Sequence, residues 1–517
     1  VNARPTFPAL SPADIDFTPS FTGGASTLLF KWDGGSYDGA AATTTLNYEV
    51  AGATRSLDVD GSGFRIFVPP FPTRFLLAPH QGSPLMGHSL RPAYKVWPGD
   101  SSPKHGVFLS ATASSGAAVL SYGSTYYFRV QTIDAGLMRS TWSGQVTHYL
   151  LDPCATRRSV ASGPWSSPAT WDWGEVPTQC SAVIVTTGTQ VTVDITTATA
   201  STTTVYGKLA FSLTQNSSLT LVAGSLTVAQ AATLELGTEA GPIGPGVSAA
   251  LVLASGTFGG QYGLIVEPGG RFFTRGASKN PWGYASASIG AGALTLSIPA
   301  ADAALWAVGD EIVIGPTDGV GLGSAERRVL TSVAGTDPLT LGWTGGVAAR
   351  VLTPDTPIAV GNLTRNVLLR SSGTIVNGPG HNSAYVLIRS TGAADAALTY
   401  TEFAFLGVNS GTRRGLQVLG GALPGRAEIS SCSIREGYWG VEVTSAVAVK
   451  LERNVIAGNN LSGLALYLMS DGARVTRNLL VKNGSYGADI DAAPNGIING
   501  NVVAANANDG FRNANSS

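Results

Sequence analysis

The C-terminal stretch from about residue 427 to residue 517 repeats with a nearly constant period. Glycines recur in it at intervals of 23, 24 and 23 residues, at Gly440, Gly463, Gly487 and Gly510. The segments 454–467, 478–491 and 501–514 can be written one above the other without a gap. A fixed period in the twenties is the signature of a solenoid. Because each repeat holds short apolar strands and no helical period, the sequence predicts a parallel β-helix rather than a leucine-rich repeat.

Aligning the repeats predicts which residues stack on one another. Two columns are aliphatic: Ile429, Leu451, Val475 and Ile498 form one, and Ile434, Ile456, Leu480 and Val503 form the other. Two further columns are asparagine: Asn454, Asn478 and Asn501 form the first, and Asn459, Asn483 and Asn506 form the second. Asparagine at a bend tolerates a left-handed backbone and can pair its amide with the asparagines above and below. We therefore interpret both columns as ladders that build the fold.

The composition favours short strands and argues against some partners. Glycine makes up 65 of 517 residues and charged residues only 13%, against a typical ~25% charged. A net charge of −1 without basic or acidic runs argues against nucleic acid and against an electrostatic contact with a membrane. No apolar run approaches the ~18–20 residues of a spanning helix. The expected partners are other extracellular proteins or glycans, or further copies of the same chain.

The ends and the cysteines suggest a piece of a larger secreted or surface protein. The chain has no initiator Met or signal peptide and stops inside a repeat. Because a solenoid normally ends in a polar cap, we expect the β-helix to be incomplete at its C-terminus. Cys154 and Cys180 bracket one compact segment and could form a disulfide, which would fit an oxidising compartment. Cys432, in the first asparagine column, would then be free.

Residues 1–150 are predicted to form a β-sandwich with an insertion at about 60–110. Strands with one face in the core are indicated by alternating apolar residues, as in 27–34 and 45–52. The order of Trp32, Tyr48 and a Tyr-x-Phe-x-Val strand at 126–130 resembles a fibronectin type III module.

The same region contains one hint of a metal site. Asp58 and Asp60, in the sequence DVDGSG, look like the start of a Ca²⁺ loop, in which alternate carboxylates converge on the cation. The third acidic position and the distal Glu are missing, so a plain glycine turn is the favoured interpretation. No other cofactor or metal is predicted.

Residues 155–275 change to valine-rich strands of four to six residues with closely spaced turns, which indicates stacked β-structure. The framework resembles the G8 domain of fibrocystin-like receptors and of cell-surface hyaluronidase-like proteins, and it is carried by Trp165, Trp171, Pro177, Asp194, Gly207 and Gly237. The resemblance continues through 305–318, with its Trp-x-x-Gly-Asp strand. It implies an extracellular, all-β protein in which the G8 domain leads into a right-handed parallel β-helix over 276–517.

Because the resemblance includes enzymes that cut hyaluronan, the repeats invite a search for catalytic groups. Glycosidic cleavage needs two carboxylates about 5–9.5 Å apart. Asp489 and Asp491 stand at i and i+2 of a predicted strand and so share a face. The alignment places Glu442, Tyr467 and Arg512 beside them, a strip that could cradle a glycan.

Two observations weigh against catalysis. An outward strand face on a β-helix must be polar in any case. The stretch 413–421 contains none of the histidines that the resemblance associates with activity. A second carboxylate group, Asp310, Asp318 and Glu326, and the lone His381 are further candidates, although Asp310 fits a turn role better.

The leading hypothesis is a non-catalytic extracellular module with a structural or adhesive role, part of a larger cell-surface or filament-forming protein. One alternative is a polysaccharide-degrading enzyme that uses Asp489 and Asp491 or the loops before residue 420. The other alternative is a glycan-binding receptor ectodomain without turnover.

Overall fold

The computed structural model describes most of the chain after residue 143 and parts of the chain before it. Residues 143–514 are described except 257–259, 318–323, 379, 391–395, 421–426, 469–470 and 492. Earlier in the chain the described residues are 10, 15–18, 26–32, 47–53, 74–76, 93–96, 101–102, 104–112, 120–133 and 140–141. Asp58 and Asp60 of the predicted calcium loop lie outside the described residues. The chain divides into two compact units, Val1–Ala155 and Thr156–Ser517.

The described strands of the first unit form two β-sheets. One has the order β1-β2-β6-β5 with β7 paired to β6, and the other has the order β4-β3-β8-β9. The strands are β1 (Ile15–Thr18), β2 (Ser26–Trp32), β3 (Asn47–Ala53), β4 (Arg74–Leu76), β5 (Ala93–Lys95), β6 (Lys104–Thr112), β7 (Leu120–Ser121), β8 (Ser124–Ile133) and β9 (Val146–Leu150). Trp32 is fully buried. The fibronectin type III assignment of this unit stays a prediction.

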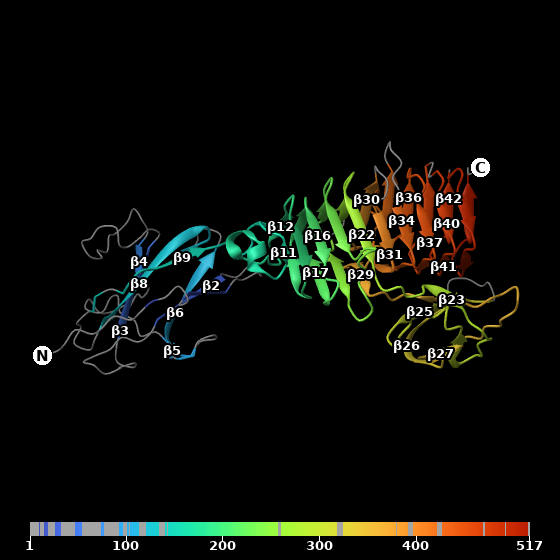
Figure 1. The fold of residues 1–517 in the computed structure, drawn as a ribbon, viewed down its shortest axis with the longest axis horizontal. Coiled ribbons are helices and arrows are strands. Elements are labelled where there is room, and N and C mark those ends of the chain that lie inside the picture. Colours follow the sequence, from blue (N-terminus) through green and yellow to red (C-terminus); the bar gives the residue numbers. More distant parts are fainter. Residues whose placement is uncertain are drawn as a thin grey trace. The chain divides into compact units, whose positions relative to one another are not determined.

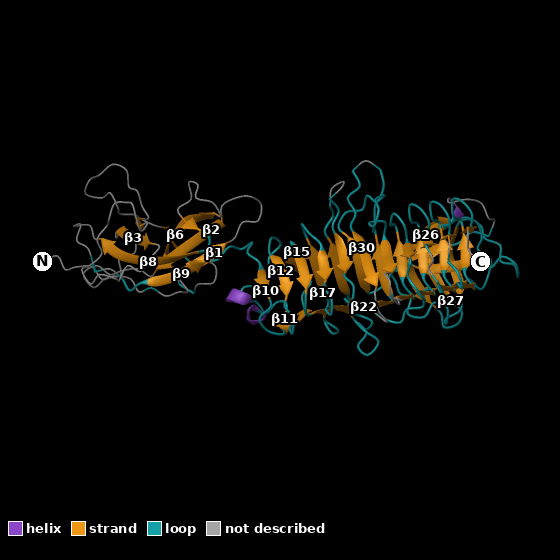
Figure 2. Ribbon diagram, turned by 90° about the horizontal axis from the view of Figure 1, so that it is seen from above, coloured by secondary structure: helices purple, strands orange, loops and turns teal. Residues whose placement is uncertain are grey.

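The second unit confirms the predicted parallel β-helix, and the described chain is all-β apart from two short 3-10 helices. Three parallel sheets run along it (Figure 1). From β12 to β22 and again from β29 to β45, successive strands belong to the first, second and third sheet in turn. One strand of each sheet therefore makes up one turn of the β-helix, which we call a rung. Figure 2 shows the strands of successive rungs side by side along the β-helix.

The strands of the three sheets are as follows. The first sheet contains β10 (Arg157–Arg158), β12 (Ala182–Val185), β15 (Thr202–Val205), β18 (Leu226–Val228), β21 (Gly263–Val266), β30 (Tyr385–Ser390), β33 (Leu416–Gly420), β36 (Val441–Thr444), β39 (Leu464–Tyr467), β42 (Ala488–Asp491) and β45 (Phe511–Ala514). The second contains β11 (Gly163–Pro164), β13 (Gln190–Val193), β16 (Lys208–Phe211), β19 (Thr233–Leu236), β22 (Arg271–Arg275), β31 (Ala396–Thr399), β34 (Ala427–Ser430), β37 (Lys450–Glu452), β40 (Arg474–Thr476) and β43 (Ile497–Asn499). The third contains β14 (Ala198–Ala200), β17 (Ser217–Leu221), β20 (Ala249–Leu253), β29 (Val367–Ser371), β32 (Thr401–Ala404), β35 (Ser433–Arg435), β38 (Val455–Ala457), β41 (Leu479–Val481) and β44 (Val502–Ala504).

The hydrophobic core lies inside the β-helix, between its three sheets, and is built from alternate residues of each strand. In β12, for example, Val183 and Val185 are buried while Ala182 and Ile184 are partly exposed. Each fully buried Val, Leu or Ile contributes about 1.5–3 kcal/mol. The predicted aliphatic columns stack in register, since Ile429 pairs with Leu451 and Ile434 with Ile456 in neighbouring strands.

Two tryptophans of the G8-like framework close the first rung. Trp165 and Trp171 are buried, and their rings meet edge to face with centroids 5.0 Å apart. The indole N–H of Trp171 donates to the carbonyl of Trp165 at 2.8 Å. The 3-10 helices η2 (Pro168–Thr170) and η3 (Asp172–Gly174) flank Trp171 and hold it in place. The two indoles thus become part of the β-helix core.

The asparagine columns form continuous hydrogen-bonded ladders. The side-chain Nδ2 of Asn454 donates to Oδ1 of Asn478 at 2.9 Å, and that of Asn459 donates to Oδ1 of Asn483 at 3.0 Å. The expected left-handed backbone does not fall on the asparagines. It falls on the residue before each of them, and these residues are Arg453, Arg477, Gly500, Gly458, Lys482 and Ala505. The left-handed residue turns the corner, which leaves the following asparagine free to point its amide along the ladder.

A separate antiparallel sheet is inserted into one rung, between β22 and β29. It has six strands in the order β23-β28-β25-β26-β27-β24, and we call it the inserted sheet. Its strands are β23 (Trp282–Tyr284), β24 (Ala293–Ile298), β25 (Glu311–Ile314), β26 (Glu326–Ala334), β27 (Leu339–Val347) and β28 (Ala359–Asn362). The sequence shows this region only as irregular repeats, because antiparallel strands there follow no fixed period.

The inserted sheet packs on the outward face of the third sheet, beside β41 (Figure 1). Val455 and Leu479 of the third sheet share one buried cluster with Val313 and Leu363 from the insertion. Strands β38 and β41 are accordingly apolar on both faces, as is typical of strands buried on two sides. The insertion therefore covers rungs that lie far downstream of the rung into which it is inserted.

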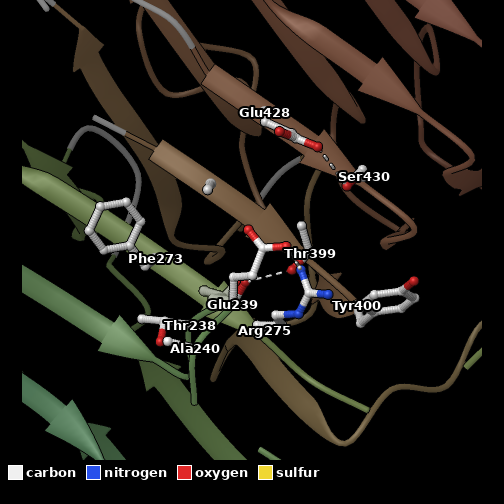
Figure 3. Close-up of a pocket in the computed structure, with 11 residues that line it drawn as sticks. Thr238, Glu239, Ala240, Phe273, Arg275, Thr399, Tyr400, Glu428 and Ser430 are labelled. Carbon is white, nitrogen blue, oxygen red and sulfur yellow. Dashed lines mark hydrogen bonds and ion pairs between the residues drawn. The ribbon is translucent and has the colours of Figure 1, made fainter. Parts of the chain in front are cut away.

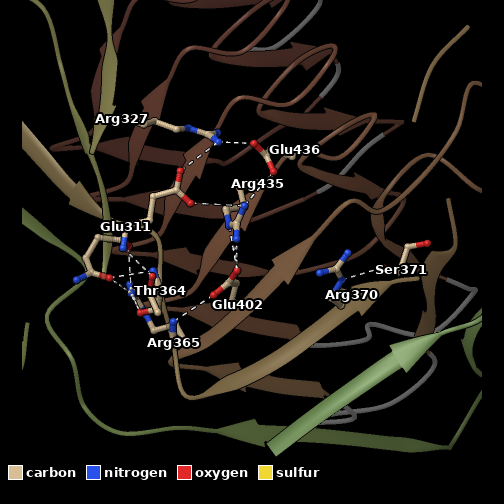
Figure 4. A network of polar contacts seen from close by, with 10 residues as sticks. Glu311, Arg327, Thr364, Arg365, Arg370, Ser371, Glu402, Arg435 and Glu436 are labelled. Atoms are coloured by element: carbon tan, nitrogen blue, oxygen red, sulfur yellow. Dashed lines mark hydrogen bonds and ion pairs between the residues drawn. The ribbon is translucent and has the colours of Figure 1, made fainter. Parts of the chain in front are cut away.

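An ion-pair network joins the inserted sheet to the third sheet (Figure 4). Arg435 lies 2.7 Å from Glu402 and 3.8 Å from Glu311 of β25, and Arg327 of β26 pairs with Glu436. Burial alone would lower the pKa of Arg435, but the surrounding carboxylates outweigh it and raise that pKa. The carboxylates thus favour the charged form of Arg435 at the junction.

Candidate functional site

The strip predicted from the repeats lies on the outward face of the first sheet. Gln417, Glu442, Ala465, Asp489 and Arg512 follow one another in register across β33, β36, β39, β42 and β45. The structure therefore brings Glu442, Asp489 and Arg512 into one column.

The carboxylate of Glu442 accepts hydrogen bonds from three neighbouring side chains. Its carboxylate accepts from Nε2 of Gln417 at 2.7 Å, from Nη1 of Arg414 at 3.3 Å and from the hydroxyl of Thr444 at 3.4 Å. Only 5% of the residue is exposed. Burial raises the pKa of Glu442, and Arg414 and the hydrogen bonds work in the opposite direction.

The carboxylate of Asp489 also has two side-chain partners. The hydroxyl of Tyr467 donates to its Oδ2 at 2.6 Å, and Nη1 of Arg512 lies 3.2 Å from its Oδ1. Burial and the hydrogen bond to Asp489 raise the pKa of the Tyr467 hydroxyl. Asp491, two residues on, is the half-buried last residue of β42. The two aspartates share a face, and Ile490 between them is buried in the core.

On this strip Glu442 and Asp489 are largely buried, with 5% and 4% of each residue exposed. Ala465, which separates them, is fully buried in a cluster with Tyr438 and Trp439. The ring of Tyr467 meets that of Trp439 edge to face at 5.6 Å. These aromatic side chains come from the turn before β36 and from β39, and they pack over Ala465 between the two carboxylates. The alignment of repeats placed the carboxylates but gave no position for the turn residues.

The other sequence candidates have structural partners. Asp310 is 4% exposed and binds Lys279 at 2.6 Å and Asn362 at 2.8 Å. Glu326 binds Arg328 and Arg350, and Asp318 lies outside the described residues. His381 is buried, with Nδ1 3.2 Å from the carbonyl of Gly378. The structure does not bring these groups together with the strip.

A hollow on the outward face of the second sheet was not foreseen (Figure 3). Its volume is about 500 Å³. It is lined by Thr238, Glu239, Ala240, Phe273, Thr274, Arg275, Ala397, Thr399, Tyr400, Glu428 and Ser430. Phe273 pairs with Ala397, and Ala397 with Glu428, on three neighbouring strands. The inserted sheet separates Phe273 from Ala397 in sequence, which hides this register from an alignment of repeats.

Two of the three cysteines are oxidised and the third is a free thiol. Cys154 and Cys180 are disulfide-bonded, and Cys432 is free and buried. Burial raises the pKa of Cys432 to about 12. Within the described residues, no group of three or more His, Cys, Asp or Glu side chains is placed to hold a metal ion. No helix in that part of the chain is long and apolar enough to cross a membrane.

Three solved structures show only distant similarity to this chain. The Pseudomonas phage phi297 tailspike gp61 is 12% identical over 59% of this chain and 50% of that chain, with a TM-score of 0.19. The Gp54 tailspike of Acinetobacter baumannii bacteriophage AP22, solved with a capsular saccharide, is 11% identical over 60% and 53%, with a TM-score of 0.17. The family 28 exopolygalacturonase of Yersinia enterocolitica is 8% identical over 99% and 98%, with a TM-score of 0.15. The chain spans about half the length of the two tailspike chains, and similarities this weak carry no argument about function.

Family comparison is more specific than these structural similarities. No curated protein sequence matches the chain. Residues 170–282 match the family described as G8 domain, and residues 371–517 match the right-handed β-helix region. The chain therefore contains a G8 domain and a right-handed β-helix region, and the strands of both lie in the same three parallel sheets.

Proposed function

We propose that the chain is an extracellular module with a structural or adhesive role, in which the β-helix is a scaffold rather than a catalytic framework. In this proposal a fibronectin-like domain (1–150) precedes a G8 domain (155–275), whose strands form the first rungs of the β-helix that continues over 276–517. The disulfide supports an oxidising compartment. The low charge of the chain, 13%, suits packing against other proteins, glycans or further copies.

The observation that carries the proposal is that aromatic side chains fill the space between two buried carboxylates, those of Glu442 and Asp489. Glu442 and Asp489 stand two strands apart, a separation of about 9.6 Å between backbones. That separation is close to the one used by glycosidases that work through an intervening water. A glycosidic bond would have to lie over Ala465, where Tyr438 and Trp439 already pack. The pair is therefore a buried polar network that stabilises the first sheet.

A depolymerisation assay tests this proposal. The wild type and the double variant Asp489→Asn/Asp491→Asn are incubated with neutral and acidic polysaccharides, and the products are measured by size-exclusion chromatography. We expect no shortening of any polymer by either protein. Cleavage by the wild type that disappears in the double variant would establish the enzyme alternative. Clustering of beads coated with the wild type, measured by microscopy, tests the adhesive role.

A further inference from the structure

We propose that the hollow on the outward face of the second sheet binds a short, neutral oligosaccharide. The inference rests on the proposed function, because it assigns a ligand that the scaffold would hold without cutting it. Four features of the hollow support it: its length, its aromatic walls, its paired charges and its place on a sheet face.

The hollow is long and has a shallow floor. It shares Ala397 and Glu428 with a second hollow of about 500 Å³, so that the two form one groove. The groove crosses five strands in register, through Phe273, Ala397, Glu428, Lys450 and Arg474. Five strands span about 19 Å at ~4.8 Å per spacing, which is room for roughly four sugar rings. The small side chain of Ala397 forms the floor of the groove between the larger side chains of Phe273 and Glu428.

Aromatic rings stand at two sides of the first hollow, where Figure 3 shows Phe273 and Tyr400. The face of an aromatic ring is electronegative and attracts the positive edges of other groups. The C–H face of a pyranose presents such edges. Tyr400 is also held by Arg275, whose guanidinium lies 5.6 Å from the centre of its ring. The groove therefore offers the apolar contacts that a sugar ring needs.

Four of the five charged side chains that line the groove form two pairs, and the fifth, Arg474, stands at its far end outside both pairs. Arg275 lies 4.0 Å from Glu239, and Lys450 lies 3.0 Å from Glu428. The hydroxyl of Ser430 donates to Glu428 at 3.3 Å. Such pairs present donors and acceptors side by side with little net charge, and sugar hydroxyls both donate and accept. An acidic polysaccharide would require a row of unpaired cations along its length, whereas only Arg474 lies outside the pairs, so the chemistry favours a neutral glycan.

The position of the groove argues against a peptide as its ligand. An extended peptide gains its main-chain hydrogen bonds by adding to a free sheet edge. The groove lies instead on the face of the second sheet, whose strands are already paired on both sides from β22 to β40. A ligand there has to bind through side chains, as an oligosaccharide does.

The test is a glycan array probed with the full chain of 517 residues, followed by calorimetry on the best glycan. We expect a neutral oligosaccharide to bind, and Phe273→Ala to weaken that binding about tenfold. Glu239→Gln, at a side chain that is 91% exposed, should also weaken binding without affecting folding. Ala397→Trp should abolish binding by filling the floor. Phe511→Ala is the matched control, because it removes an equally large ring, 41% exposed on β45, from outside the groove.

Circular dichroism verifies that each variant is folded before its binding is compared. Absence of binding to every neutral glycan, stronger binding to acidic glycans, or equal losses in Phe273→Ala and Phe511→Ala would each overturn the inference. The proposed function and the binding groove can be refuted independently of each other. If the bound glycan is shortened, the scaffold role is wrong while the groove remains a binding site. If nothing is bound and nothing is cut, the groove is wrong while the scaffold role stands.

Discussion

Replacing Asn478 by alanine removes the middle of the first asparagine ladder. Asn478 is fully buried, and its side chain takes part in four hydrogen bonds. It accepts from the backbone N–H and the side-chain amide of Asn454, and it donates to the carbonyl of Leu451 and to Oδ1 of Asn501. A buried hydrogen bond contributes about 1 kcal/mol net, and a buried donor left without its acceptor costs about 1–3 kcal/mol. The substitution should therefore lower the free energy of unfolding by about 4 kcal/mol.

Thermal unfolding followed by circular dichroism measures this loss. With an unfolding entropy of about 2 cal/mol/K per residue, a loss of that size lowers the Tm of a unit as large as the β-helix by roughly 5 °C. Asn508→Ala is the control, because Asn508 is exposed and makes a single side-chain hydrogen bond to Ser485 at 3.2 Å. It should change stability by less than about 0.5 kcal/mol. Equal melting temperatures for Asn478→Ala and Asn508→Ala would refute the ladder argument.

Three further predictions follow from buried polar groups. Arg435→Ala leaves Glu402, whose side chain is 7% exposed, without its ion-pair partner, and should cost about 3 kcal/mol or more in urea unfolding. Lys450→Ala, at a pair whose side chains are each 42% exposed, should cost less than about 1 kcal/mol, and equal losses in the two variants would contradict the burial argument. Burial raises the pKa of Glu442 in the folded state. The protonated side chain therefore contributes fully to the free energy of unfolding below the pKa that Glu442 has in the unfolded chain, and this contribution is lost as the pH rises through the raised pKa of the folded state. Urea unfolding from pH 4 to 7 should show this loss in the wild type and not in Glu442→Gln, and parallel pH profiles would count against it. Cys432, with a pKa of about 12, should resist N-ethylmaleimide at pH 8 in the folded protein and react in urea, as measured by mass spectrometry.

The sequence repeat was sufficient to predict the β-helix and its register. A period of 23–24 residues aligned Ile429 with Leu451 and Ile434 with Ile456, and the structure pairs them in the same way. The prediction succeeds because a parallel coil repeats its backbone every rung, so that like residues stack.

The sequence of the third sheet contains a sign of the inserted sheet that the repeat period alone does not reveal. The strands VIA (455–457) and LLV (479–481) are apolar at every position. Only the middle residue of each can face the core, so the flanking residues had to be covered from outside. The sequence therefore indicated that something packs on the third sheet, but not which segment does so.

The candidate sites depended on residues that the repeat does not position. The carboxylates of Glu442 and Asp489 occur where the alignment puts them, but both are buried, and Ala465 between them packs against Tyr438 and Trp439 from a turn. The groove depends on Phe273, whose partner strand begins only after the insertion. Turns and insertions vary from rung to rung, and so their side chains cannot be placed from a period.

The inserted sheet changes how the β-helix should unfold. In a simple solenoid each rung contacts only its neighbours, so the terminal rungs fray one at a time. Here Trp282 donates to the carbonyl of Arg477, 195 residues away in sequence, and Lys482 donates to the carbonyl of Ala325. Opening of β38 or β41 therefore requires release of the whole insertion. The described rungs beyond β35 should lose their amide protection together in hydrogen exchange, as one cooperative unit that is slow to form because its contacts are distant in sequence.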